Sequence, residues 1–155
     1  MFLISNPLPS KVGGNAEMTK PEQKSGIFRV LDSLCSAYSV PYELVYEIGM
    51  NESRWKNSED LEYIQMCGIE GEDSRGDLQV NMKYAEYFKN RYNVSNLDRI
   101  GLLEISVKHL SWLGKRHKSW RKARFVYARG SWRGYKTWTN MEQHFMNKIN
   151  WYKYD

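Results

Sequence analysis

The chain has 155 residues and a formal net charge of +5, with 41% hydrophobic and 26% charged residues. This length predicts a single domain that is large enough to bury its own hydrophobic core. The composition excludes a chain that is disordered throughout, and no apolar run approaches the ~20 residues that a membrane-spanning helix needs. We therefore expect one globular domain without a membrane span.

The first 21 residues differ in composition from the rest. They hold three of the four prolines and a Gly-Gly pair, so we predict a flexible N-terminal arm over 1–21 and a folded domain over 22–155. The opening sequence MFLISNPLPS lacks the charged start and the apolar run of about 7–15 residues that are typical of a secretory signal. We expect the protein either to stay where it is made or to leave by a route other than general secretion.

Two helices are predicted before residue 56. The first has an apolar face at helical spacing, formed by Ile27, Val30, Leu31, Leu34 and Tyr38. Pro41 fits the first turn of the second helix, where its missing N–H costs nothing, and this helix is predicted to run to about Trp55. Its apolar face holds Val45, Ile48 and Gly49. The same spacing continues to Glu52, so a glutamate is predicted on the buried stripe near the helix end.

The rest of the chain predicts further helices and a mainly α fold. Residues 56–77 are polar and acidic, which indicates a long irregular loop or small hairpin between the second and third helices. The third helix is marked by Val80, Tyr84, Tyr87, Phe88 and Arg91, and the fourth by Ile100, Leu103, Val107, Leu110 and Gly114. A fifth helix is expected over about 119–129. Thr139 and Glu142 form a capping box before a last helix that buries Phe145, Ile149 and Tyr152.

Glu52 is the strongest candidate for chemistry. A carboxyl group on an apolar stripe loses hydration, which favours its protonated form. A carboxylic acid that keeps its proton near neutral pH can act as a general acid and protonate a leaving oxygen. The alternative is structural: Glu52 lies at a frayed helix end and pairs with Arg54 or Lys56.

The sequence predicts neither a metal ion nor any other cofactor. Cys35 and Cys67 have no metal-ligand partner at close spacing, and two cysteines cannot form a disulfide framework. His109, His117 and His144 are scattered and form no HxxxH or HExxH pattern. The fold must therefore rest on packing.

Three motifs resemble those of the soluble-type catalytic domain of the lytic transglycosylases, in the lysozyme-like superfamily. Asn51–Trp55, which follows a helix start at Val40–Leu44, resembles the E-S-R-[FW] glutamate motif of that family. Gly76–Asn81 is similar to its G-L-M-Q-[IV] segment. Asp98–Leu113 resembles the helix before the last motif, and Tyr127–Gly130 stands where the family usually shows Y-N-x-G.

This resemblance covers about residues 26–135 and implies a lysozyme-like fold with a groove for peptidoglycan. It implies cleavage of the bond from N-acetylmuramic acid to N-acetylglucosamine (MurNAc–GlcNAc), with Glu52 as the sole essential acid/base. Glu52 would protonate the glycosidic oxygen and then deprotonate the MurNAc 6-hydroxyl, which closes a 1,6-anhydro ring. Ser53 would orient Glu52. The implied substrate-binding residues are Gln79, Asn81, Tyr127 and Arg129, although core packing is an equal alternative for Tyr127.

Departures from the family pattern leave hydrolysis open. Ala128 replaces the usual Asn, and Asp77 replaces an apolar residue beside Gln79. An inverting hydrolase needs a second carboxylate about 6.5–9.5 Å from the first, so that a water fits between them. Asp77, or failing it Asp73 or Glu72, is the candidate, which would make the protein a muramidase on the same fold. The structural alternative is an exposed Asp in a Gly-flanked turn.

Positive charge and aromatic residues gather in the second half of the chain. From Ile105 to Met141 there is no Asp or Glu, but there are ten Lys and Arg residues. The same region holds Trp112, Trp120, Trp132, Tyr135 and Trp138. A basic surface predicts an anionic partner, and aromatic rings can stack on sugars. This face is therefore predicted to hold the protein on peptidoglycan, with an ordinary solvated surface as the alternative.

Two further functions remain open. One is a nucleic-acid-binding module, which the basic and aromatic residues favour but which leaves Glu52 unexplained. The other is a non-catalytic wall-binding component. We expect peptidoglycan glycan strands as the partner, with other virion or secretion-machine proteins as further candidates. A cell-wall enzyme without an export signal resembles a phage product, carried in the virion or released from the host cytoplasm during lysis. A bacterial enzyme exported by a dedicated machine is the alternative.

Overall fold

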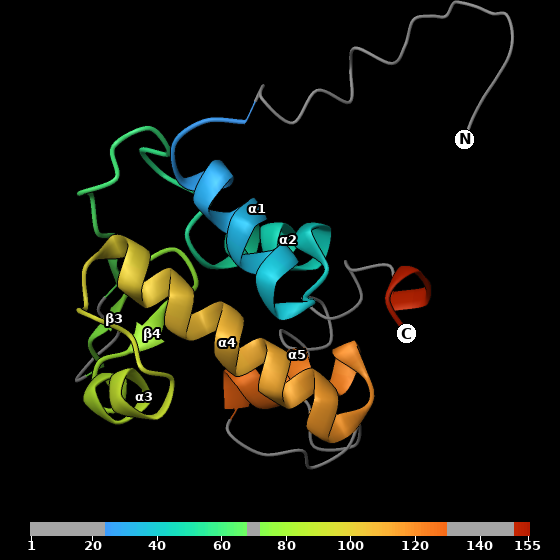
Figure 1. Cartoon of the computed structure of the whole chain (residues 1–155). Coiled ribbons are helices and arrows are strands. Elements are labelled where there is room, and N and C mark those ends of the chain that lie inside the picture. The colour runs from blue at the N-terminus through green and yellow to red at the C-terminus, as the bar shows by residue number, and fades with distance from the viewer. Residues whose placement is uncertain (1–23, 68–71, 130–150) are drawn as a thin grey trace, which may run out of the picture.

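The computed structural model describes residues 24–67, 72–129 and 151–155, and the statements below concern these residues (Figure 1). The predicted N-terminal arm, residues 1–21, lies outside them. The predicted capping box, Thr139 and Glu142, also lies outside them. The same holds for residues of the predicted last helix, namely Phe145, Ile149 and the side chain of Tyr152, and for the aromatic residues Trp132, Tyr135 and Trp138.

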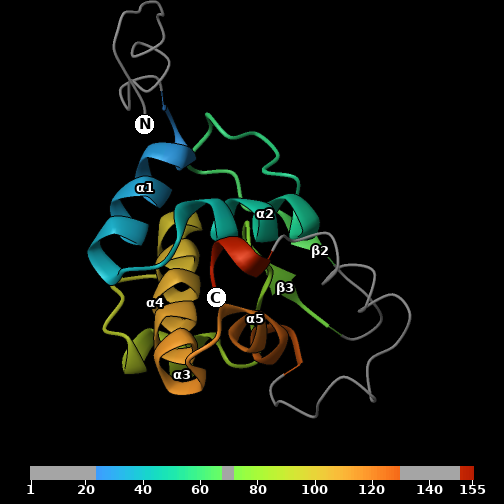
Figure 2. The same ribbon diagram turned by 90° about the vertical axis from the view of Figure 1, so that its right-hand side faces the viewer.

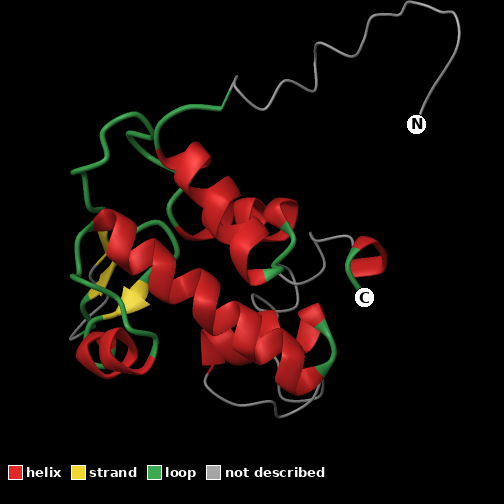
Figure 3. Ribbon diagram, viewed as in Figure 1, coloured by secondary structure: helices red, strands yellow, loops and turns green. Residues whose placement is uncertain are grey.

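The prediction of a mainly α protein is confirmed, and the helices are accompanied by a small three-stranded sheet (Figure 3). The helices are α1 (Ile27–Tyr38), α2 (Tyr42–Glu52), α3 (Ala85–Arg91), α4 (Arg99–His117) and α5 (Trp120–Arg129), followed by a 3-10 helix at Trp151–Lys153. The strands are β2 (Met66–Cys67), β3 (Ser74–Arg75) and β4 (Val80–Asn81). None of the helices described here combines the length and the apolar character that crossing a bilayer would require.

Helix α4 is the centre of the fold, because other elements cover it on several sides (Figures 1 and 2). Its side chains Leu103, Val107 and Leu110 pack in one cluster with α1 and α2. Leu102 and Ile105 pack in a second cluster with the sheet and α3, and Leu113 packs against α5. The predicted fourth and fifth helices are confirmed, and the fourth is buried over a wider arc than one apolar stripe.

Helix α1 confirms its predicted apolar face. Ile27, Leu31 and Cys35 are buried, and the other predicted face residues pack against the same core. The helix ends at Ser39, whose φ of 57° is left-handed. Pro41 lies one position before α2 as its N-cap, and not inside the first turn as predicted.

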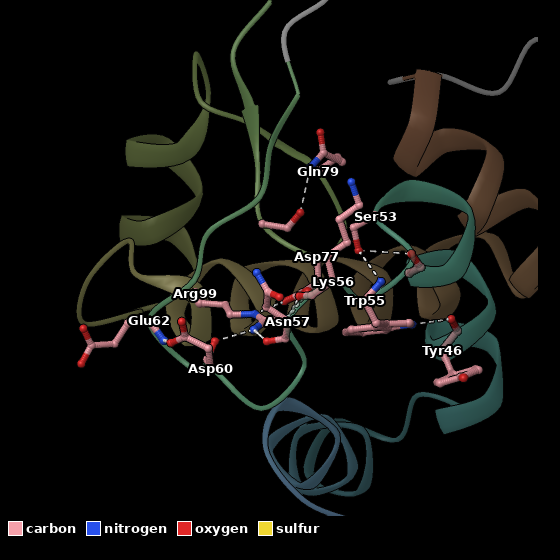
Figure 4. A network of polar contacts seen from close by, with 12 residues as sticks. Tyr46, Ser53, Trp55, Lys56, Asn57, Asp60, Glu62, Asp77, Gln79 and Arg99 are labelled. Atoms are coloured by element: carbon pink, nitrogen blue, oxygen red, sulfur yellow. Dashed lines mark hydrogen bonds and ion pairs between the residues drawn. The ribbon is translucent and has the colours of Figure 1, made fainter.

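Helix α2 ends at Glu52, three residues before the predicted end at Trp55. Arg54 and Trp55 have φ angles of 60° and 53°, and this left-handed conformation cannot continue a right-handed helix. The reversal brings the Trp55 ring to the place that a side chain on Gly49 would need. The indole Nε1 also donates to the carbonyl of Tyr46 at 2.9 Å (Figure 4). Glu52 is therefore the last residue of α2, with the chain turning back beyond it.

The polar segment after α2 forms a turn and a hairpin, as predicted, and a third strand extends the sheet. Strands β2 and β3 pair antiparallel, as do β3 and β4, with Ser74 opposite Asn81. The assignment of Val80 to the third helix is wrong, because Val80 lies in β4 and α3 begins only at Ala85. Tyr84 and Tyr87 are exposed, so the helical spacing of these apolar residues does not reflect a buried helix face.

Candidate active site

A cavity of about 700 Å³ is bounded by the end of α2, the sheet, α4 and α5. Its lining brings together four of the predicted site residues from three parts of the chain. Glu52 comes from α2, Gln79 and Asn81 come from the turn before β4 and from β4, and Tyr127 comes from α5. Residues of α4 and of the α3 region also line it, among them Tyr84, Phe88, His109 and Trp112.

Glu52 keeps contact with solvent and is paired with an arginine. Its side chain is 29% exposed, and Oε2 accepts a hydrogen bond from Nη2 of Arg124 at 3.0 Å. Arg124 is a buried residue of α5, so the pair ties the last residue of α2 to α5. Within the described residues, Arg54 and Lys56 do not bond Glu52, and its Oε1 has no hydrogen-bond partner. That second oxygen is available to a ligand in the cavity.

Ser53 does not contact Glu52 directly, in contrast to the role that the family resemblance implies. Its hydroxyl donates to the carbonyl of Gly49 at 3.3 Å and accepts from the backbone N–H of Trp55 at 3.1 Å (Figure 4). Both bonds fix the last turn of α2 and the reversal after it. Ser53 therefore supports Glu52 through the backbone and not through its side chain.

Gln79 and Asn81 present amide groups at the cavity. Gln79 has a φ of 53°, a conformation that costs a residue other than glycine on the order of 1 kcal/mol. Its Nε2 donates to the carbonyl of Gly76 at 2.8 Å, and Oδ1 of Asn81 accepts from the backbone N–H of Lys83 at 3.0 Å. An amide has two donors and an acceptor, so both side chains keep groups that can bind a sugar.

Tyr127 is both a core residue and a cavity residue. Its hydroxyl lies 3.0 Å from the carbonyl oxygen of Leu78 and 2.8 Å from Oγ of Ser106. Burial raises the pKa of Tyr127 above its ordinary value, so the phenol stays protonated. Core packing and substrate binding were the two alternatives for Tyr127, and its position is compatible with both, because it packs in the core and also lines the cavity. Ala128 lines the cavity as well.

Asp77 is not available as a second carboxylate, in contrast to the prediction. It is buried and paired with Arg99, through Nε to Oδ2 at 2.9 Å and Nη2 to Oδ1 at 2.7 Å. The same guanidinium group also donates to the backbone carbonyls of Lys56, Asn57 and Asp60 (Figure 4). Asp77 thus anchors the turn before β4 to α4 and to the loop after α2.

The other acidic candidates differ in their surroundings. Asp73 is exposed, and both of its oxygens accept hydrogen bonds from Arg75 at 2.9 Å. Glu72 is also exposed and lines the cavity. Among the described carboxylates, Glu52 and Glu72 are the two in the cavity lining. Arg129 ends α5, but its side chain lies outside the description.

Two arginines, Arg124 and Arg99, hold side chains of this region in place, although the sequence does not mark either as a site residue. Arg124 precedes Tyr127 by three residues in the predicted fifth helix, which places both on one helix face. That spacing is the signal by which sequence analysis could have found it. Arg99 has no such local signal, because its partner Asp77 lies on a different element.

Comparisons with known proteins do not assign the chain to a family. Neither the scan against protein-family models nor the searches of curated proteins and solved structures found a match.

His109 is expected to make the protein sensitive to mild acid. Burial and, to a smaller extent, Arg91 lower the pKa of His109 to about 4. In the unfolded chain the His109 imidazole takes up a proton near pH 6.5, but in the folded protein it stays neutral down to about pH 4. The contribution of His109 to the free energy of unfolding is therefore fully present above about pH 6.5 and decreases as the pH falls toward 4. Urea unfolding at several pH values should show a loss of about 2 kcal/mol from this residue by pH 4.5. In His109→Gln that part of the loss should be absent. Parallel pH profiles for the two proteins would contradict the expectation.

The two cysteines are expected to react very differently. Cys35 is buried and burial raises its pKa to about 12, whereas Cys67 is exposed and lines the cavity. A thiol reagent should therefore modify Cys67 alone in the native protein and both cysteines in denaturant, which mass spectrometry can count. A bulky adduct on Cys67 should also block ligand access to the cavity. The Cys67→Ser variant is the control, because it should be insensitive to the reagent.

Proposed function

We propose that this protein cleaves peptidoglycan as a lytic transglycosylase, cutting the MurNAc–GlcNAc bond and leaving a 1,6-anhydro-MurNAc end. The observation that carries the proposal is the position of Glu52, a half-buried carboxylate at a helix end that lines a cavity together with Gln79, Asn81 and Tyr127. These residues belong to the three motifs that resemble the family. The substrate lies in the bacterial cell wall, where a phage product would act from the virion or at host lysis.

Glu52 acts twice in this reaction. It first donates its proton to the glycosidic oxygen, the bond from C1 of MurNAc to that oxygen breaks, and GlcNAc leaves with a new hydroxyl group. The 6-hydroxyl of the same MurNAc then bonds to C1 and returns its proton to Glu52. No water is consumed, so one carboxylate is sufficient, whereas most glycosidases need two.

Two features of the surroundings of Glu52 bear on this proposal. Nη2 of Arg124 donates to Oε2 at 3.0 Å, and Glu52 lines the cavity, so Oε1 is the oxygen that would exchange the proton with the substrate. Asp77 is engaged by Arg99 and so does not supply a second carboxylate there. A glutamate at a helix end, beside a small antiparallel sheet and opposite two packed helices, also supports a lysozyme-like domain.

The experiment that tests the proposal is mass spectrometry of the products released from insoluble peptidoglycan, together with the loss of turbidity. Anhydro ends, lighter by one water than reducing ends, are the expected main product. Reducing ends would contradict transglycosylation. Binding to the sediment without clearance or product release would contradict an enzymatic function altogether.

A muramidase that hydrolyses the same bond is the second candidate. The observation that favours it is Glu72, which lines the cavity together with Glu52. In an inverting hydrolase Glu72 would activate a water on the opposite face of the sugar ring. This alternative requires reducing ends as the main product and their loss in Glu72→Gln. The transglycosylase proposal expects anhydro products from wild type and Glu72→Gln alike.

A further inference from the structure

Two arginines, one from α3 and one from α4, contact a tryptophan of the cavity lining. Trp112 of α4 lines the cavity and remains 37% exposed. The guanidinium carbon of Arg91 lies over its ring at 4.7 Å from the ring centroid, and that of Arg116 lies over it at 5.4 Å. Arg91 is the last residue of α3, and Arg116 follows Trp112 by one helical turn. Two helices thus bring two positive charges to one indole ring.

These two charges have no acidic counterpart in the described part of the chain. Arg91 Nη1 donates to the hydroxyl of Tyr87 at 3.1 Å, and the ion pairs of the described residues include neither Arg91 nor Arg116. His109 stacks on Trp112 with 9° between the ring planes, and it adds no negative charge. Both guanidinium groups carry a positive charge beside one indole ring, so an anion bound there is attracted to both.

We propose that Arg91, Arg116 and Trp112 form a subsite for a carboxylate on the peptide substituent of the glycan strand. The planar fork of a guanidinium group matches a carboxylate and binds it through two parallel hydrogen bonds. The contact with the indole ring holds each guanidinium group in place before the ligand arrives. The subsite therefore recognises a planar anion on a preformed surface.

The cavity identifies which carboxylate reaches this subsite. Glu52 and Trp112 line the same cavity, so a glycan strand cleaved at Glu52 would also reach Trp112. A peptidoglycan strand can bring an anionic group there, because each MurNAc can bear a peptide with free carboxylates. The inference rests on the proposed function and adds to it a preference for peptide-bearing strands over strands without peptides.

The test compares soluble glycan strands that bear peptides with strands from which an amidase has removed them. Affinity is measured by calorimetric titration and cleavage by product release. Arg91 and Arg116 are both exposed, so the double variant Arg91→Gln/Arg116→Gln is expected to keep its fold, which circular dichroism checks. It should lose about tenfold or more in affinity and in kcat/KM on peptide-bearing strands, and less than about twofold on strands without peptides.

The matched control is Lys89→Gln/Lys115→Gln, which removes one charge from each of the same two helices but leaves both arginines beside Trp112 in place. It should behave as wild type on both strands. Equal losses of the arginine variant on both strands, or none on either, would overturn the subsite. If the wild type binds strands without cleaving them, the proposed function fails. In that case the subsite would still be supported if the wild type binds peptide-bearing strands more tightly than bare strands and the arginine variant binds both equally.

Discussion

Replacing Glu52 with Gln is expected to abolish peptidoglycan cleavage while the protein stays folded. Gln keeps the shape of the side chain, and its amide oxygen can still accept the hydrogen bond from Arg124. It can neither donate nor accept the proton that both chemical steps need. Loss of a general acid/base costs about 10²–10⁴-fold in rate. Product release measured by mass spectrometry should therefore fall by at least that factor. The melting temperature should fall as well, because buried Arg124 loses its charged partner, so circular dichroism is used to check that the variant is folded.

The matched control for this variant is Glu43→Gln on the same helix. Glu43 is exposed in the first turn of α2 and lies outside the cavity lining, so its neutralisation should leave cleavage at the wild-type rate. A Glu52→Gln protein that clears peptidoglycan at a rate near wild type would show that the assigned acid/base is wrong. Equal losses in both variants would point to a change in α2 and not to chemistry.

Replacing Arg99 with Met is expected to give the largest loss of stability. Arg99 is 1% exposed, and it pairs with the buried carboxylate of Asp77 and with three backbone carbonyls. Removing one partner of a buried ion pair leaves an uncompensated charge and costs about 3–5 kcal/mol. The free energy of unfolding in urea should fall by about this amount.

An exposed pair in the same region provides the control for Arg99→Met. Asp73 and Arg75 also make two hydrogen bonds, but they lie at the surface, where an ion pair contributes less than about 1 kcal/mol. Asp73→Asn should therefore change the free energy of unfolding by no more than that. In the double variant Asp77→Leu/Arg99→Met the buried charge is gone, so part of the lost stability should return. A single Arg99→Met variant as stable as Asp73→Asn would contradict the anchoring role.

Local sequence patterns predict most of the helices and the candidate acid. Apolar spacing predicts α1 and α4, because the periodicity of a buried face is a local property of the sequence. The same spacing placed Glu52 on the inner side of α2, at the helix end. The hairpin after α2 was also indicated, since a long polar segment with glycines cannot form another buried helix.

Tertiary structure alone decided the partners of the charged residues and the surroundings of Glu52. Local spacing records which face is buried, but not which side chain approaches from another element. The sequence alone predicts Asp77 to be a free carboxylate, whereas the structure pairs it with Arg99 of α4. The sequence likewise offers Arg54 and Lys56 as partners for Glu52, whereas its partner in the structure is Arg124 of α5. Val80 was misassigned for the same reason, because a strand of two residues is defined by its pairing with β3 and not by its own sequence.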